Sequence, residues 1–225
     1  MGYVITAILP YAIAIIVSPV PIVAMIQLLT GADGMRKGLT FLAGWFAVCL
    51  LAPALLSPLL GEPFWGGLRH AVTGWLLLLM GAALVVLGGA VAAKVLHHPE
   101  AGVREPPRWL SALDWLGRPE AALAPAPLNV ANPLNIIALL AASAVLGRFA
   151  LGVGDTLLAA AVFALVCCVG IAVPVITAAL PTVDSASVLQ RARQTLVTYG
   201  DHIRTAVALL FGALLLWQGL TILFL

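Results

Sequence analysis

Six long apolar runs, separated by short polar connectors, organise the whole chain. All nine Asp and Glu, all eleven Lys and Arg and all four His lie outside these runs. Each run has about 20 residues or more, the length at which a helix crosses a hydrocarbon core of about 30 Å. The pattern predicts six transmembrane helices, near residues 4–29, 39–60, 72–93, 123–146, 157–180 and 205–224.

Two of the six runs carry proline in their middle, where a helix would otherwise continue. Ser18-Pro19-Val20-Pro21 interrupts the first run and Asn132-Pro133-Leu134-Asn135 interrupts the fourth. Proline removes a backbone donor and clashes with the preceding turn, and the freed backbone groups cannot face lipid. We therefore expect the first and fourth helices to be broken within the membrane. Broken helices in corresponding positions of two halves indicate a transporter's substrate site.

Composition places the chain in the all-α class of integral membrane proteins. It is 63% hydrophobic and 9% charged, with a mean hydropathy of +1.12, whereas a soluble domain has about 25% charged residues. The polar stretch from residue 94 to 121 has too few apolar residues for a core of its own. We expect a first three-helix unit over 1–93, a cytoplasmic connector over 94–121 and a second three-helix unit over 122–225.

The basic residues predict the orientation of the chain. The first, third and fifth connectors hold most of them, namely Arg36, Lys37, Lys94, Arg104, Arg108, Arg118, Arg191 and Arg193, with Arg204 at the edge of the last run. The second and fourth connectors hold only Arg69 and Arg148. Because positively charged connectors stay in the cytoplasm, both termini should face outward.

With three helices in each half, the second half then enters the membrane in the opposite direction from the first. The expected architecture is a 3+3 inverted repeat. A shift of 114 positions aligns Ser18 with Asn132 and Pro19 with Pro133, and also Ile22 with Ile136 and Ala24 with Ala138.

The connector carries a short predicted helix over residues 108–116, between Pro106-Pro107 and Gly117-Arg118-Pro119. Trp109, Leu113 and Leu116 share one face of it. These three side chains could anchor the helix in the headgroup layer. The alternative is an ordinary loop helix packed on the transmembrane helices.

Asp, Glu, Lys, Arg and His are absent from the six runs, which argues against a proton relay, a metal site or catalysis within the membrane. His97-His98 with Glu100 lacks the spacing of a metal site. We expect neither an enzyme nor a bound cofactor.

The polar side chains of the fourth run are concentrated at its break. All three asparagines of the chain, Asn129, Asn132 and Asn135, occur there at intervals of three and lie roughly on one helical face. One interpretation is that they bond neighbouring helices or the backbone freed by Pro133. The other is that they line a substrate path; its expected members are Ser18, Pro19, Pro21, Gln27, Asn129, Asn132, Pro133 and Asn135.

The two breaks and the connector together resemble the GAP family, which is named for glycopeptidolipid-addressing and sulfolipid-addressing proteins of mycobacteria and belongs to the LysE transporter superfamily. The matching segments are residues 18–21, 105–114 and 128–135. The family pattern at the second break is Asn-Pro-Lys-Asn, and Leu134 replaces the lysine here. The resemblance implies a six-helix exporter in an actinobacterial plasma membrane, linked to surface-lipid traffic.

Three functions remain open from the sequence. The first is a transporter that exports a cell-surface glycolipid, its precursor or a related solute. The second is a non-transporting scaffold for lipid-synthesis or export proteins, and the third is a LysE-type exporter of small solutes such as amino acids. The expected partners are membrane lipids, a polar or amphipathic substrate, such lipid-handling proteins and a second copy of the chain, but no nucleic acid.

Overall fold

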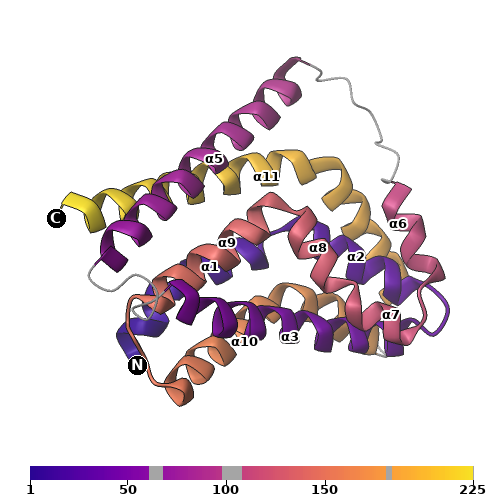
Figure 1. Cartoon of the computed structure of the whole chain (residues 1–225). Coiled ribbons are helices and arrows are strands. Elements are labelled where there is room, and N and C mark those ends of the chain that lie inside the picture. The colour runs from indigo at the N-terminus through magenta and orange to yellow at the C-terminus, as the bar shows by residue number, and fades with distance from the viewer. Residues whose placement is uncertain (61–67, 98–107, 181–183, 225) are drawn as a thin grey trace.

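The computed structural model describes residues 1–60, 68–97, 108–180 and 184–224, and within these ranges all regular secondary structure is helical. Four helices are long and apolar enough to cross a membrane by themselves: α3 (Gly34–Leu60), α5 (Arg69–His97), α10 (Val153–Ala179) and α11 (Ser185–Phe224). Figure 1 shows both chain termini at one end of the bundle and α6 and α7 at the other. The chain is thus a multi-pass helical membrane protein.

Two further spans are bent pairs, and the bends fall at the predicted prolines. α1 (Gly2–Ile16) meets α2 (Pro19–Thr30) at 54°, and the stretch formed by α7 (Arg118–Leu123) and α8 (Pro125–Ala131) meets α9 (Pro133–Gly147) at 89°. With each pair counted as one span, the described residues hold up to six spans. The predicted breaks in the first and fourth runs are confirmed.

The same local chemistry produces both bends. Ser18 and Asn132 have extended backbones, with ψ of 120° and 107°, and each precedes a proline that opens the next helix. A residue before proline is excluded from the helical region by contact with the proline ring. Proline itself fits the first helical position, where its missing N–H would have no partner.

The long helices pack in pairs drawn from the two halves of the chain. α3 lies beside α10, and α5 runs along α11. α3 also contacts α7 and α8, while α10 contacts α1. Gly44 on α3 and Gly170 on α10 permit these approaches, since an added Cβ would lie 1.9 Å from the carbonyl oxygen of Ala122 and 2.5 Å from that of Ile16.

The α5–α11 pair is also a backbone contact. A Cβ on Gly81 would lie 2.8 Å from the carbonyl oxygen of Gly212, and one on Gly212 would lie 3.0 Å from that of Gly81. About two turns away, a Cβ on Gly219 would lie 2.8 Å from the carbonyl oxygen of Gly74. Small residues at these positions allow the two helix backbones to touch.

The last helix is longer than the sequence pattern predicts. α11 has 40 residues and begins at Ser185, whereas the apolar run begins at residue 205. At about 1.5 Å per residue it is about 60 Å long, roughly twice the hydrocarbon core. Asp184 supports the early start, because its side chain accepts a hydrogen bond from the Ser187 backbone N–H at 3.4 Å.

The predicted connector helix is present as α6 (Arg108–Ala112) followed by the 3₁₀ turn η2 (Leu113–Trp115). Leu110 and Leu113 are buried against the protein, Leu116 is half-buried, and Trp109 is 37% exposed. The aromatic side chain that projects furthest is Trp115, at 89% exposure. The segment therefore packs on the transmembrane helices. Of the histidine and glutamate residues considered as a metal site, His98 and Glu100 lie outside the described residues.

Candidate functional site

The two broken helices are joined at their breaks. Asn132 donates a hydrogen bond from Nδ2 to Oγ of Ser18 at 2.8 Å, and its Oδ1 accepts one from the Leu134 backbone N–H at 3.2 Å. Ser18 is fully buried and Asn132 is 7% exposed. One amide therefore caps α9 and links the first span to the fourth.

A cavity of about 550 Å³ lies against this junction. Leu84, Leu87 and Val91 of α5 form one wall, and Val20 of α2 with Trp109 of α6 form another. The break supplies Asn132, Pro133 and Leu134, preceded on α8 by Pro127, Leu128 and Ala131, and α11 supplies Arg204 and Ala208. The walls are mainly apolar.

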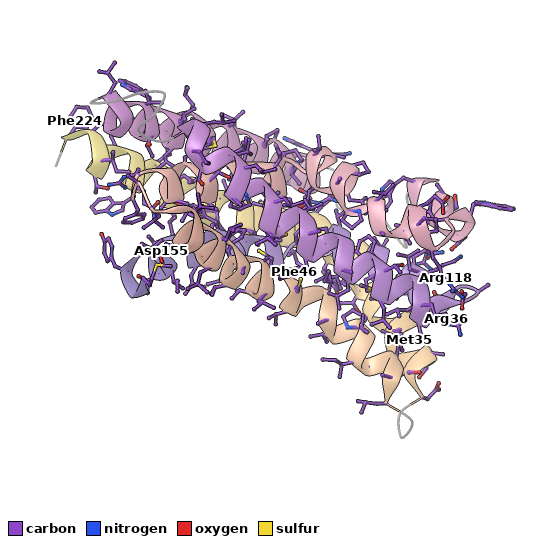
Figure 2. All side chains as sticks on the ribbon, turned by 60° about the horizontal axis from the view of Figure 1, so that its bottom comes forward. Met35, Arg36, Phe46, Arg118, Asp155 and Phe224 are labelled. Carbon is purple, nitrogen blue, oxygen red and sulfur yellow. The ribbon has the colours of Figure 1, made fainter. Side chains whose placement is uncertain are left out.

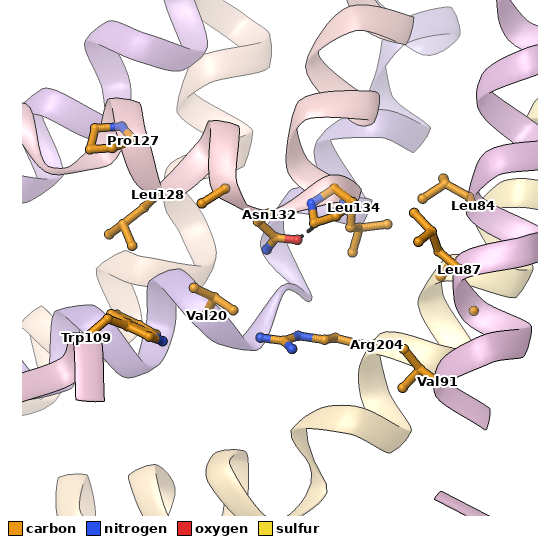
Figure 3. A pocket seen from close by; sticks show the side chains of 14 residues that line it. Val20, Leu84, Leu87, Val91, Trp109, Pro127, Leu128, Asn132, Leu134 and Arg204 are labelled. Carbon is orange, nitrogen blue, oxygen red and sulfur yellow. Dashed lines mark hydrogen bonds between the residues drawn. The ribbon is translucent and has the colours of Figure 1, made fainter. Parts of the chain in front are cut away.

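Arg204 is the charged side chain on the cavity wall. Figure 3 shows it extending from α11 toward the space below Asn132 and Val20. Its side chain is 45% exposed, and Nη1 lies 3.7 Å from Oδ1 of Asp201, a loose pair that leaves guanidinium donors for another group. The cavity thus presents one cation and one amide within apolar surroundings.

Arg204 was not among the residues expected from the sequence, because it was assigned to the edge of the last apolar run. The continuous α11 carries it into the wall, four residues before Ala208. The sequence signal that could have indicated its place in the wall is that Arg204 is the last charged residue before the final apolar run.

The other two asparagines lie inside the protein. Asn129 Nδ2 donates to the carbonyl oxygen of Pro125 at 2.9 Å, and Asn135 Nδ2 donates to Asn129 Oδ1 at 3.3 Å. Both side chains are buried, and neither lines the cavity. Asn129 thus bonds the backbone of its own helix and Asn135 links α9 to α8, while buried Asn135 Oδ1 has no partner among the described atoms.

The remaining expected path residues are dispersed. Pro19 lines a smaller hollow of about 110 Å³ next to the cavity, together with Trp109 and Arg204. Pro21 is buried in α2. Gln27 donates to Oδ1 of Asp114 at 2.6 Å and so binds α2 to η2 instead of lining the cavity.

Two polar contacts outside the cavity were not anticipated. Buried Tyr11 donates its hydroxyl hydrogen to Oε1 of Gln218, which connects α1 with α11. At the end of the bundle that holds the connector, Arg118 binds Asp33, with Nε 2.7 Å and Nη2 2.6 Å from Oδ2. In the described ranges, no group of three or more His, Cys, Asp and Glu could hold a metal ion.

Comparison with known proteins gives one family. No curated protein and no solved structure matches the chain significantly. Residues 8–221 match the family described as Sap, sulfolipid-1-addressing protein, and this stretch includes both breaks and every residue that lines the cavity. The chain therefore belongs to the sulfolipid-1-addressing protein family.

Proposed function

We propose that this protein is a transporter that exports an amphipathic lipid, or the precursor of one, across the plasma membrane. The observation that carries the proposal is the cavity at the junction of the two broken helices. Broken spans are the usual location of a substrate site in secondary transporters, because the unwound backbone needs polar surroundings. Here the break residue Asn132 both joins the two spans and lines the cavity.

The cavity lining favours an amphipathic substrate with a negatively charged headgroup. Its walls are mostly apolar, as ligand sites usually are, and its volume lies within the usual range of about 300–1,000 Å³. A guanidinium recognises sulfate-like and phosphate-like oxygens through parallel hydrogen bonds. The family name refers to a sulfolipid. A sulfated headgroup at Arg204 accords with that name and with the hydrogen bonds that a guanidinium makes to sulfate-like oxygens. The family pattern has a lysine at the break where this chain has the apolar Leu134. Arg204 is therefore the cation that we propose binds the headgroup.

We also propose that the two halves form an inverted repeat that supports alternating access. The packing favours it, because a contact from the first half to the second has a counterpart from the second half to the first. Gly44 brings α3 against α7 much as Gly170 brings α10 against α1. The turns after α2 and α9 each contain a non-glycine residue with positive φ, Asp33 at 58° and Ala150 at 46°.

The proposed orientation has both termini outside the cell. In Figure 2, Arg36 and Arg118 lie at one end of the bundle, and Asp155 and Phe224 lie toward the other. The end with these arginines is assigned to the cytoplasm by the positive-inside rule.

A scaffold for lipid-synthesis proteins would require neither the cavity nor the bonded breaks, and export of a small polar solute would not require apolar walls. An export assay separates these functions. A deletion strain receives wild type, Arg204→Gln, Asn132→Leu or Arg191→Gln, and cell-surface and intracellular lipids are compared. Arg191 is the control because it is exposed on the same helix and does not line the cavity.

Arg204→Gln and Asn132→Leu should cause an amphiphile to accumulate inside the cell, whereas Arg191→Gln should restore export. Full export by both cavity variants at normal protein levels would overturn the proposal. If both variants leave lipid export intact but no longer recruit lipid-synthesis proteins, the scaffold function is favoured instead.

A further inference from the structure

A second apolar hollow adjoins the cavity on the side of the connector. It has a volume of about 450 Å³ and lies between η2, α7 and α8. We call it the trough and define it by its eight lining residues, Trp109, Leu113, Leu116, Glu120, Leu123, Ala124, Pro127 and Leu128. Seven of these eight side chains are apolar or aromatic.

The trough and the cavity are neighbouring parts of one apolar surface. Trp109, Pro127 and Leu128 line both. Trp109 thus stands at the boundary between them, and Figure 3 shows it at the edge of the cavity. A chain-like ligand that occupied the cavity could therefore continue past Trp109 into the trough without leaving apolar surroundings.

Charge distinguishes the two ends of this combined surface. The cavity end has Asn132 and Arg204, which is paired at 3.7 Å with Asp201 outside the cavity lining, whereas the trough end has Glu120. An anionic headgroup is attracted by the guanidinium and repelled by the carboxylate. An anionic amphiphile should therefore place its headgroup in the cavity and its hydrocarbon in the trough.

We propose that the trough is a binding subsite for one acyl chain of the amphiphile whose headgroup lies at Arg204. This inference rests on the transport function proposed above. Leu123 on the rim is 72% exposed, and Trp115 beside the trough is 89% exposed, so that its edge is an apolar surface directed outward. Through such an edge a chain can pass from the bilayer into the protein without contacting water, which would be unfavourable.

Photo-crosslinking locates the chain directly. The full-length protein is placed in phosphatidylcholine nanodiscs that contain a trace of phosphatidylglycerol with a diazirine in one acyl chain. The comparison probe is phosphatidylcholine with the same chain. The phosphatidylglycerol probe should label α8 and the segment from Leu113 to Leu123, and excess unlabelled phosphatidylglycerol should suppress that labelling. The phosphatidylcholine probe should give weaker labelling that is not suppressed.

Matched variants on α8 test whether the trough itself holds the chain. Leu128→Trp fills the shared wall, whereas Val130→Trp adds the same ring two residues away at a 66% exposed position outside the trough. Leu128→Trp should abolish suppressible labelling and Val130→Trp should preserve it. Leu116→Trp, which fills the trough from the residue directly after η2, should repeat the loss. Arg204→Gln should lower labelling about tenfold, the loss expected from one charge-assisted hydrogen bond of about 1.5 kcal/mol.

Three results would overturn the subsite. Equal, unsuppressed labelling by both probes would mean that ordinary bilayer lipid covers the trough. Suppressible labelling confined to Leu84, Leu87 and Val91 would place the chain elsewhere, and the transport proposal would still stand. If neither probe gives suppressible labelling and Arg204→Gln still exports normally in cells, the transport proposal fails together with the subsite.

Discussion

Asn132 donates a hydrogen bond to Ser18, the residue that stands 114 positions earlier and precedes the opening proline of the other broken span. Alignment of the two halves pairs these same residues. When two equivalent positions contact each other, they lie close to the axis that would relate the halves. The substrate cavity proposed here thus begins where the two halves meet.

The Ser18–Asn132 bond should contribute to function more than to stability. Ser18→Ala removes the acceptor, and Asn132→Leu removes both the donor and the cap of α9. Hydrogen bonds between spans contribute about 0.6 kcal/mol on average and at most about 1.7 kcal/mol. We therefore expect Asn132→Leu to abolish export with little change in thermal stability, and Ser18→Ala to reduce export less.

Export and thermal unfolding of the two single variants and the double variant give the coupling energy between these residues. Asn129→Ala is the control for a buried amide outside the cavity, since Asn129 bonds Pro125 and Asn135 and does not line the cavity. Stability losses proportional to the export losses would show that the amides are structural.

A methyl group added at Gly44 or Gly170 should lower stability far more than one added at an exposed glycine. Gly44→Ala and Gly170→Ala force a Cβ into backbone carbonyl oxygens 1.9 Å and 2.5 Å away, and such overpacking costs about 1–3 kcal/mol or more. Gly89→Ala is the control, because no atom lies within 4 Å of its added Cβ. Its stability should be unchanged or about 0.5–1 kcal/mol higher. Thermal unfolding in detergent measures the stability of all three variants. Equal stabilities would contradict the packing described.

The Asp33–Arg118 contact should hold the connector end of α7 to the turn after α2. Both side chains are 41–49% exposed, so the pair is expected to contribute no more than about 1 kcal/mol, and less at high salt. Asp33→Asn removes the charge but tolerates the positive φ of 58°. Asp33→Ala should cost about 1–2 kcal/mol more, because alanine is strained in that conformation.

Hydrogen exchange along Arg118–Leu123 and thermal unfolding distinguish the loss of the ion pair from the backbone strain that alanine adds at residue 33. Exchange should accelerate in both variants, whereas the additional loss of stability should occur only in Asp33→Ala. Unchanged exchange in both would mean that the ion pair does not restrain α7.

Cysteine labelling tests the proposed orientation. In a cysteine-free background, Ala32→Cys lies in the turn after α2 and Gly154→Cys in the first turn of α10, both exposed. An impermeant maleimide should label residue 154 in intact cells and residue 32 only after the membrane is opened. The reverse pattern would invert the assigned topology.

The sequence predicts the spans well because their physical cause is local. Charge-free runs of sufficient length must lie in lipid, and Pro19 and Pro133 break a helix wherever they stand inside one. The path of α11 before residue 205 was not predictable in this way, because residues 185–204 form no charge-free run and the helix contacts α2 and α10, which the sequence does not place beside it.

The candidate site was only partly predictable for a related reason. Asn132 stands at a break, and its role as a cap follows from its neighbours. Whether Asn129 and Asn135 face a cavity or the interior depends on which helices surround them. Arg204 could not be assigned without knowing that α11 carries it past the break.

The glycine contact between α5 and α11 also determines how the cavity can change shape. Because Gly81 and Gly212 bring backbone against backbone, the spacing of the two helices depends on the main chain and cannot adjust through side-chain rotation. The backbones that carry Leu84 and Arg204, one in each helix, are therefore expected to move as one unit. In the alternating access proposed above, a shift of this unit relative to Asn132 would move the apolar wall and the cation together, so that a bound amphiphile would be displaced as a whole.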